Sequence, residues 1–358
     1  MNRPVYIGAE YLCTPLGRGA KENFAQLLLG HSAVRPVANA GFNQETLHLG
    51  AFAQPCSFDE LIGDAFANLD IDPELLTSPK TRVMLSTTKG DLTNGIEGAM
   101  QRAMESVQRH SRSFHPPLVF SNACITGVSV LNKAAEYIAA GLCEHVIVVG
   151  CDVLSPFVIY GFQSLFAIAD GRCKPYDAHR SGINLGEACG AIVLSASRSI
   201  FAEPPLIHAG GSVTNDANHI SGPSRTGEGL HRSITQILLK KNINLNKASY
   251  TCAHGTATRF NDDMESVAFT RSKLSEIPVN SLKAYFGHTL GAAGVIETAM
   301  AMQSLRQDII PATLGYETPG TAEPLNVIRE NLATQLEFVL KTASGFGGGN
   351  ASLLLTRS

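Results

Sequence analysis

The chain has 358 residues, of which 44% are hydrophobic and only 16% charged, and its formal net charge is −3. This length favours two packed halves over one simple core. The charge balance, without any basic block, argues against a protein that binds nucleic acid through a basic surface. No apolar run reaches the length of a membrane span, so no membrane association is expected.

Cysteines occur at positions 13, 56, 124, 143, 151, 173, 189 and 252. None of them forms a Cys-x-x-Cys pair, and no group of cysteines and histidines has zinc-finger spacing, so no metal site is expected. Residues 1–8 lack the basic and apolar segments of a signal peptide. A reduced, cytoplasmic enzyme is the simplest class, with all but one of the cysteines packed in the core.

Apolar runs and helical spacing predict an alternation of strands and helices over the first 150 residues. The predicted strands lie at 5–9, 83–88, 118–120 and 145–150. The predicted helices lie at 21–29 and 128–140, and Gly141 ends the second one. Residues 30–57 are mixed, with short strand-like pieces. Strands that alternate with helices indicate an α/β protein with a mainly parallel sheet.

A weak internal repeat runs through the chain. An apolar helix after residue 124 and another after residue 288 are each followed, roughly sixty residues later, by a Gly-rich turn and an apolar strand. These turns and strands lie at 186–194 and 345–355. The pattern predicts duplication of one α/β unit. The halves would meet near residue 200, which divides the chain into domains 1–200 and 201–358.

Cys124 is the residue that the local pattern singles out. It comes just ahead of an apolar helical pattern, and a helix N-terminus favours an anion, hence thiolate over thiol. The small residues Ser121 and Gly127 suggest a tight strand-to-helix turn that exposes the side chain as a nucleophile. A lone cysteine is more often a buried hydrophobe, so both readings stay open here. Two histidines beside glycine, His254 and His288, are candidate bases.

Four motifs in a fixed order narrow the reading. They are Asn-Ala-Cys at 122–124, Ala-His-Gly-Thr-Ala-Thr at 253–258, Lys283 with Gly-His at 287–288, and Gly-Phe-Gly-Gly at 345–348. Together they resemble the elongating 3-oxoacyl-[acyl-carrier-protein] synthases (beta-ketoacyl synthases) of the thiolase superfamily. The resemblance covers most of 118–358, whereas 1–110 match only loosely. It implies an α/β fold, the thiolase-like duplicated αβαβα five-layer fold with mixed, mainly parallel sheets.

The resemblance also implies a chemistry, the decarboxylative Claisen condensation. Cys124 would take an acyl group from a thioester, and the backbone N–H groups of Cys124 and Phe346 would form the oxyanion hole. The ring N–H groups of His254 and His288 would stabilise the enolate left when a malonyl group loses CO2. The substrates would travel on the phosphopantetheine of a carrier protein, so no separate cofactor is expected.

Further site residues follow from the same resemblance. Lys283 would lie inside the protein, paired with Glu265 to orient the histidines, because a buried ammonium needs a partner. Thr256 and Thr258 would hydrogen-bond the amides of the phosphopantetheine arm, and Phe162 would line the acyl pocket. Taken singly, each has an ordinary reading, as a solvated lysine, as strand-favouring threonines or as a core aromatic.

The implied partners are an acyl carrier protein and a second subunit, which is either an identical chain or a related synthase or chain-length factor. Strands near 118–122 would pair across the two-fold axis of this dimer. Carrier proteins are acidic, so their docking needs local basic residues. The candidates are Arg82, Lys89, Arg172, Lys174 and Arg259.

Three other readings are weighed against this one. A chain-length-factor-like subunit shapes the pocket of an active synthase without condensing, but such subunits commonly lack the cysteine that is present here. A degradative thiolase uses a second cysteine near its C-terminal Gly-rich loop, and 345–350 contain none. An initiating synthase would show a Cys-His-Asn set, and His288 argues against it. The pathway stays open among fatty-acid, polyketide and aryl-polyene synthesis.

Overall fold

The structure, a computed structural model, describes residues 3–243, 245 and 248–358. Its main feature within these residues is one large sheet of eleven strands, in which ten form two groups of five and the short β2 (Gly17–Arg18) lies beside them. From the edge to the centre, the first group is β6 (Leu118–Phe120), β5 (Thr81–Ser86), β7 (His145–Asp152), β8 (Ala188–Ser195) and β1 (Tyr6–Thr14). The second group is β11 (Val279–Asn280), β10 (Ser249–Cys252), β14 (Phe338–Gly345), β15 (Gly349–Thr356) and β9 (Leu206–Asn215).

Both groups have the same internal order. Counted along the chain within each group, the strands lie as third, second, fourth, fifth and first from edge to centre. The two first strands, β1 and β9, pair antiparallel where Tyr6 lies opposite Ile207, and this joins the groups. The repeated order supports the proposed division of the chain near residue 200.

The strands run in mixed directions, as predicted. Among the described strands of each group, four of the five run the same way, and only β8 or β15 runs against them. The parallel pairs are confined to the outer three strands of each group, and β8 and β15 return antiparallel beside them. Within each group the sheet is therefore mixed and mainly parallel, as expected, and the two groups join antiparallel through β1 and β9.

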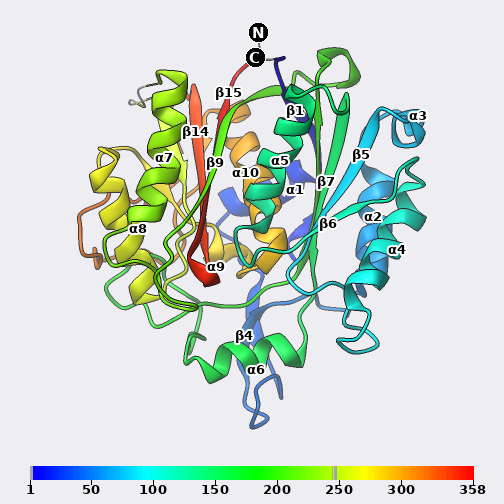
Figure 1. The fold of residues 1–358 in the computed structure, drawn as a ribbon. Coiled ribbons are helices and arrows are strands. Elements are labelled where there is room, and N and C mark those ends of the chain that lie inside the picture. The colour runs from blue at the N-terminus through cyan, green and yellow to red at the C-terminus, as the bar shows by residue number, and fades with distance from the viewer. Residues whose placement is uncertain (1–2, 244, 246–247) are drawn as a thin grey trace.

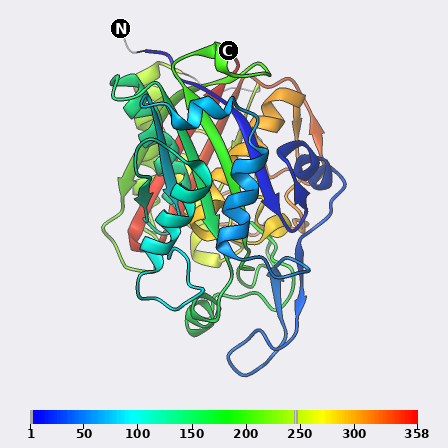
Figure 2. The ribbon, with the colours of Figure 1, turned by 90° about the vertical axis from the view of Figure 1, so that its right-hand side faces the viewer.

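Helices fill three layers around the two groups of strands (Figures 1 and 2). Each outer layer packs on the exterior of one group, and the middle layer packs between them. The outer helices are α2 (Phe58–Asn68) and α4 (Ala99–Ser111) on the first group, and α7 (Glu228–Lys241) and α8 (Arg259–Arg271) on the second. The middle layer holds α1 (Ala20–Leu28), α5 (Thr126–Ala139) and α10 (Ala293–Gln307). The alternation αβαβα matches the expected five layers.

The two central helices touch at a pair of glycines. A Cβ on Gly294 of α10 would lie 2.4 Å from the backbone nitrogen of Val128, and one on Gly127 of α5 would lie 2.7 Å from the Cα of Gly294. The backbones therefore meet at a distance that only glycine permits. The largest apolar cluster of the protein surrounds this crossing and includes residues from both groups of strands.

Shorter elements complete the chain. They are β2 (Gly17–Arg18), the hairpin of β3 (Val34–Val37) and β4 (Leu47–Gly50), α3 (Pro73–Thr77), α6 (Pro156–Ser164), α9 (Lys283–Phe286), β12 (Ile309–Ile310), β13 (Leu332–Ala333) and the 3-10 turns η1 (Arg198–Ile200), η2 (Leu290–Ala292) and η3 (Phe346–Gly348). The predicted strand at 118–120 is confirmed, and the predicted helix at 128–140 begins two residues earlier. No helix within the described residues is long and apolar enough to cross a bilayer.

Candidate active site

Cys124 lies in a tight turn between β6 and α5. The preceding residue, Ala123, has a φ of 46°, in the left-handed region that L-residues seldom adopt. The Thr126 hydroxyl donates to the Ala123 carbonyl at 2.6 Å and accepts from the Asn122 N–H at 2.8 Å, which fixes the turn. The sequence prediction of a strand-to-helix turn is confirmed. The side chain it presents is 8% exposed, so it faces the interior of a cavity rather than bulk water.

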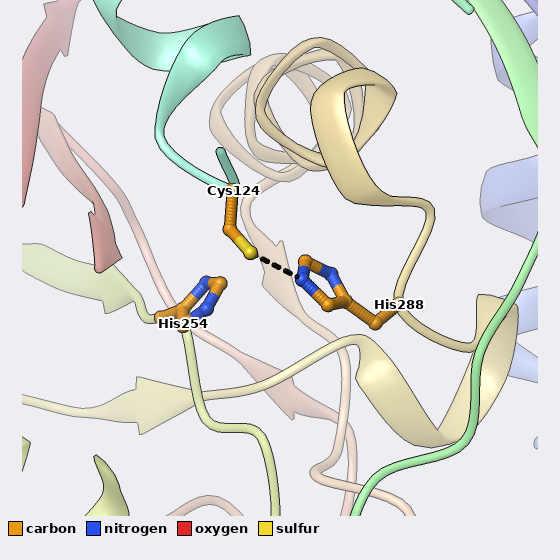
Figure 3. Close-up of side chains that lie close together, drawn as sticks. All are labelled: Cys124, His254 and His288. Carbon is orange, nitrogen blue, oxygen red and sulfur yellow. Dashed lines mark hydrogen bonds between the residues drawn. The ribbon is translucent and has the colours of Figure 1, made fainter. Parts of the chain in front are cut away.

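The structure brings both candidate histidines to this cysteine (Figure 3). Nε2 of His288 lies 2.9 Å from Sγ of Cys124, and the two imidazole rings meet edge to face with centroids 5.3 Å apart. One donor atom from each of the three side chains lies within 4.8 Å of the others. His254 follows β10, and His288 follows α9, so three distant segments converge on one point.

A cavity of about 610 Å³ leads to these three residues. Thr256 and Thr258 line it, and their hydroxyl oxygens lie 2.8 Å apart. Phe162 and Phe346 also line it, with stacked rings whose centroids are 5.6 Å apart. The residues predicted to contact the pantetheine arm and the acyl chain thus border the same space as Cys124, although their roles stay predictions.

Two backbone N–H groups lie beside the sulfur. The amides of Phe346 and of Cys124 itself favour the charged form of the thiol and so lower its pKa. A Cβ on Gly345 would lie 3.0 Å from the nitrogen of Cys124, which shows how closely the Gly-rich turn approaches. Gly347 has a φ of 81°, a conformation that glycine adopts without strain. Two convergent amides of this kind can bind a developing oxyanion.

The thiol itself corrects an expectation. Burial raises the pKa of Cys124 to about 11, and the nearby Lys283 ammonium and the Phe346 N–H only partly oppose this. The helix N-terminus was expected to favour thiolate, but α5 begins two residues further on and the sulfur lies in a desolvated pocket. The cysteine therefore rests as a thiol, and a base must take its proton.

Both imidazoles are neutral near neutral pH. Burial, followed by the positive charge of Lys283, holds the pKa of His254 and of His288 well below the usual value. A neutral ring offers one acceptor and one donor nitrogen. The three side chains have donor atoms close enough to hold a metal ion, but the neighbouring ammonium disfavours a second cation. That the site uses no metal stays a prediction.

The predicted pair of Lys283 and Glu265 is wrong. Lys283 is fully buried, and its ammonium forms an ion pair with Glu297 of α10. A second buried lysine, Lys341 of β14, holds the other oxygen of the same carboxylate at 2.7 Å. Lys283 faces the middle helix layer, whereas Glu265 belongs to α8 in the outer layer, so the partner comes from the helix that packs closer.

Glu265 supports His254 in another way. Its carboxylate accepts from the backbone N–H of His254 at 2.9 Å and from that of Gly255 at 2.7 Å. The Tyr176 hydroxyl donates to it as well, at 3.0 Å. Burial raises the pKa of Glu265, and these hydrogen bonds oppose the rise. The side chain thus fixes the loop that carries His254, although it touches no histidine ring through an ion pair.

Sequence reasoning missed three charged residues around the site. Glu297 and Lys341 were overlooked, although each is a single charge within an apolar run, and such a charge needs a buried partner. Asp152 at the end of β7 was also missed. It accepts from the amide of Gly291 at 2.7 Å and from the ammonium of Lys89 at 2.8 Å.

The predicted docking residues divide into two groups. Lys89 is buried in its ion pair with Asp152, and Arg82 lies near the start of β5, away from the end of that strand which borders the site. Neither fits a docking surface beside the cavity. Arg172 and Arg259 are exposed and Lys174 is half-buried, and Arg259 lines the cavity.

Comparison with known protein families places this site in context. The model of the beta-ketoacyl synthase N-terminal domain matches residues 114–199, and that of the beta-ketoacyl synthase C-terminal domain matches residues 207–317. The first match contains Cys124, and the second contains His254 and His288. The two matches meet close to the point where the strand order begins to repeat.

Individual relatives agree. The chain is 32% identical to 3-oxoacyl-[acyl-carrier-protein] synthase 2 of Rhizobium meliloti over 253 residues, which are 66% of this chain and 59% of that protein. It is 28% identical to the synthase of the same name from Coxiella burnetii, over 99% of both. The chain thus matches less than two thirds of the length of the first relative. A ketosynthase structure solved in complex with its chain length factor, from Xenorhabdus doucetiae, has a TM-score of 0.88 at 24% identity, covering 99% of this chain and 98% of that one.

The strand order and the five layers define a thiolase-like α/β fold. The chain belongs to the beta-ketoacyl synthase family. The family and the fold expected from the sequence are therefore confirmed.

Proposed function

We propose that this protein catalyses the decarboxylative Claisen condensation of an acyl-enzyme with a malonyl thioester, both delivered by an acyl carrier protein. The observation that carries the proposal is the convergence of Cys124, His254 and His288 within 4.8 Å at a cavity. The amides of Cys124 and Phe346 add an oxyanion site at the same sulfur. No separate cofactor is proposed, because the substrates bring their own phosphopantetheine.

Acylation of the cysteine would come first. Sγ of Cys124 attacks the carbonyl carbon of the acyl thioester, and the bond from this carbon to the carrier sulfur breaks. The thiol proton moves to Nε2 of His288, 2.9 Å away, and from there to the departing thiolate. The amides of Cys124 and Phe346 hold the oxyanion of the tetrahedral intermediate.

Condensation would follow. The malonyl carboxylate leaves as CO2, and the electron pair of its C–C bond passes into an enolate whose oxygen accepts from the ring N–H groups of His254 and His288. The enolate carbon attacks the acyl carbonyl, a C–C bond forms and the C–S bond to Cys124 breaks. The released thiolate takes one proton from solvent. Because burial and Lys283 keep both imidazoles neutral, each can act as a hydrogen-bond donor.

The test is mass spectrometry of the purified chain with a panel of acyl-carrier thioesters, followed by malonyl carrier protein. We expect an acyl adduct on the protein, its transfer to a 3-oxoacyl carrier and release of CO2. Absence of both adduct and product across the panel would reject the proposal. Because the panel varies chain length and type, the same experiment reports the acyl specificity and with it the pathway, whether fatty-acid, polyketide or aryl-polyene synthesis.

The alternative is a subunit that shapes the pocket of an active synthase. The observation behind it is that the similar structure from Xenorhabdus doucetiae is a complex of a ketosynthase with its chain length factor. This alternative would predict no acyl adduct on this chain but a change in product length when the chain is added to an active synthase. Cys124 in contact with His288 favours the catalytic reading.

We also propose a dimer, either of identical chains or with a related synthase or chain-length factor. Strand β6 is the edge of the large sheet, and its three residues are half-buried. An edge with free backbone groups pairs readily with a second chain. A groove of about 400 Å³ beside it is lined by Met104, Phe114 and two prolines, among others. Sedimentation that shows a stable monomer at micromolar concentration would reject the dimer.

Carrier docking would use Arg172, Lys174 and Arg259, the predicted basic residues that remain once the buried Lys89 and the distant Arg82 are set aside. Attraction between these residues and an acidic carrier would weaken as salt rises, since exposed charges are screened. Turnover with acyl-carrier substrates that does not depend on salt would reject this surface. A cytoplasmic location stays a prediction of the sequence.

A further inference from the structure

Lys341 is a fully buried lysine that the chemistry above does not use. It lies in the middle of β14, opposite Cys252 of β10, and its side chain is 0% exposed. A charge enclosed to this degree is costly unless it is paired and hydrogen-bonded. Its contacts therefore show what the fold gains from keeping it there.

The ammonium of Lys341 joins three segments. It donates to the carbonyl oxygen of Thr342 at 2.7 Å and to those of Cys252 and Ala253 at 3.3 Å each. It also pairs with Glu297 at 2.7 Å. Cys252 and Ala253 directly precede His254. Their carbonyl groups are thus tied to the central helix α10 through one side chain.

The same contacts lead on to the second histidine. Glu297 holds Lys283 through its other oxygen, and the Lys283 carbonyl accepts from the N–H of Gly287 at 2.8 Å. Gly287 directly precedes His288. An unbroken path of ion pairs and hydrogen bonds therefore runs between the backbone before His254 and the backbone before His288.

We propose that Lys341 is a positioning residue. It links the backbone segments that precede His254 and His288, and so fixes where each imidazole lies relative to Cys124. Glu265 already fixes the N–H groups of His254 and Gly255 from the opposite side. Lys341 binds the carbonyl oxygens of Cys252 and Ala253, just before His254 in the chain. The inference rests on the proposed condensation, because it assigns Lys341 to the step that uses both rings.

The charge of Lys341 adds a second effect. One carboxylate, that of Glu297, faces two ammonium groups, so the group keeps a net positive charge beside the imidazoles. This charge helps to hold the pKa of both histidines below its usual value. The other charged or titratable groups around the rings are Cys124 of the turn before α5, Asp152 of β7, Glu265 of α8, Lys283 of α9 and Glu297 of α10.

The experiment compares Lys341→Met, which removes both the charge and the hydrogen bonds, with Lys341→Gln, which keeps donors without charge. Lys133→Met, on the exposed face of α5, is the control. We measure malonyl decarboxylation, acylation of Cys124 and the acid limb of the pH–rate profile. Lys341→Met should slow decarboxylation by about 10²-fold, the scale of a misplacement near 1 Å, with KM changed much less.

The two variants should separate position from charge. Lys341→Gln should recover part of the decarboxylation rate. In both variants the acid limb should move to higher pH, because loss of a positive charge raises the pKa of the histidines. Acylation of Cys124 should change less than decarboxylation, and Lys133→Met should behave as the parent protein.

Several results would overturn the proposal. One is a Lys341→Met variant with the parent's rate and acid limb. Another is an equal loss of acylation and decarboxylation. If Lys341→Met fails to fold, Lys341→Gln, which leaves Glu297 paired with Lys283, takes its place, and a parent-like decarboxylation rate and acid limb or failure to fold in that variant equally overturns the proposal. A parent protein that neither acylates nor decarboxylates refutes the proposed function instead.

Discussion

The two groups of strands have the same order, but the turns that precede their central helices carry different residues. In each, a left-handed residue precedes a central helix: Ala123 with φ 46° before α5, and Leu290 with φ 54° before α10. The next residue is Cys124 in the first group and Gly291 in the second. Gly127 and Gly294, three residues further on, make the helix crossing. The turn of the first group therefore carries the candidate nucleophile, whereas the equivalent turn of the second group carries a glycine without a side chain.

The surroundings of the two turns explain this asymmetry. Strands β7 and β14 occupy equivalent places, and they end in Asp152 and Gly345. The Asp152 carboxylate accepts a hydrogen bond from the amide of Gly291. Gly345 has no side chain, so the amide of Cys124 is left facing the cavity. The second copy of the site is filled by a charged side chain. A repeated fold therefore provides two turns of the same shape, and the residue at one strand end decides which can bind a substrate oxyanion.

The connections after these strands differ too. β14 passes to β15 through the three-residue turn η3, which brings Phe346 to the sulfur. β7 passes to β8 through residues 153–187, a long segment that includes α6. This segment hydrogen-bonds the backbone of His288 through the Asn184 carbonyl at 2.7 Å and the Gly186 amide at 2.9 Å. The long connection of one half therefore holds a histidine of the other.

The largest effect should come from removing the thiol of Cys124, which has no counterpart in the equivalent turn of the second group. Cys124→Ala makes the two turns chemically alike, and it should abolish the acyl adduct and condensation because no other group can carry the acyl chain. Intact mass spectrometry after incubation with an acyl-carrier thioester measures this. Cys56→Ala, a half-buried thiol elsewhere in the chain, should keep the adduct. An adduct that persists in Cys124→Ala would show that another residue is the nucleophile.

Gly345→Asp should copy the filled turn into the catalytic half. The new carboxylate would compete for the amide of Cys124, as Asp152 does for Gly291, and place a negative charge beside the oxyanion. We expect acylation to slow by about 10²–10³-fold, the cost of losing one oxyanion donor. Gly345→Ala, which adds bulk without charge, should lose less. Normal acylation rates in the aspartate variant would contradict the assignment of this amide.

The histidines should separate by step. His288 contacts Sγ and His254 has no such hydrogen bond, so His288→Ala should slow both acylation and malonyl decarboxylation. His254→Ala should slow decarboxylation by about 10²-fold, the usual cost of one donor, while acylation largely survives. Single-turnover mass spectrometry measures acylation, and CO2 release measures decarboxylation. Unchanged decarboxylation in both variants would remove the histidines from the enolate step.

At the filled turn before α10, the effect should appear in stability. Asp152→Ala leaves the buried Lys89 without its partner, which we expect to cost about 3–5 kcal/mol of unfolding free energy. Glu203→Ala, which breaks an exposed pair with Lys21, should cost no more than about 1 kcal/mol. Urea unfolding of the three proteins gives both differences. Equal midpoints for the Asp152 and Glu203 variants would show that the filled turn contributes nothing to the fold.

The smallest effect concerns pH. The pKa of each histidine is lowered in the folded protein, so the neutral form persists at and below the ordinary histidine value near 6.5. Activity should therefore stay level as pH falls from about 8 to 6.5 and decline only below that, together with stability, because the unfolded chain binds more protons there. Profiles of kcat/KM against pH test this. A midpoint at or above 6.5 would mean that the rings are not desolvated in solution.

The sequence was sufficient for the parts of the site that rest on local pattern. Cys124, His254 and His288 each lie in a short motif with glycine or small neighbours, and the order of the motifs pointed to one family. The repeat of helix, Gly-rich turn and apolar strand predicted duplication, and the strand order has that repeat. These features depend on neighbours in the chain, which the sequence lists directly.

The errors concern relations across space. Glu265 and Glu297 are both acids on helices near Lys283 in the chain, and only packing shows that the second one pairs with it. The expectation that Lys283 lies inside the protein agrees with the structure, and only its partner was wrong. The pKa of Cys124 depends on desolvation, which the turn does not reveal. Strand direction was not among the errors: the resemblance supplied the mixed sheet in which β8 and β15 run antiparallel, which periodicity alone does not give.

The glycine crossing of α5 and α10 has a consequence for biosynthesis. All strands of the first group precede residue 200, so this sheet can form early, yet the apolar face of α5 is covered only when residues 293–307 leave the ribosome. Roughly a hundred residues must be translated in between, which at 5–20 residues per second takes several seconds. A partly synthesised chain therefore exposes the apolar face of α5 for that time, and we expect nascent-chain chaperones to bind this face.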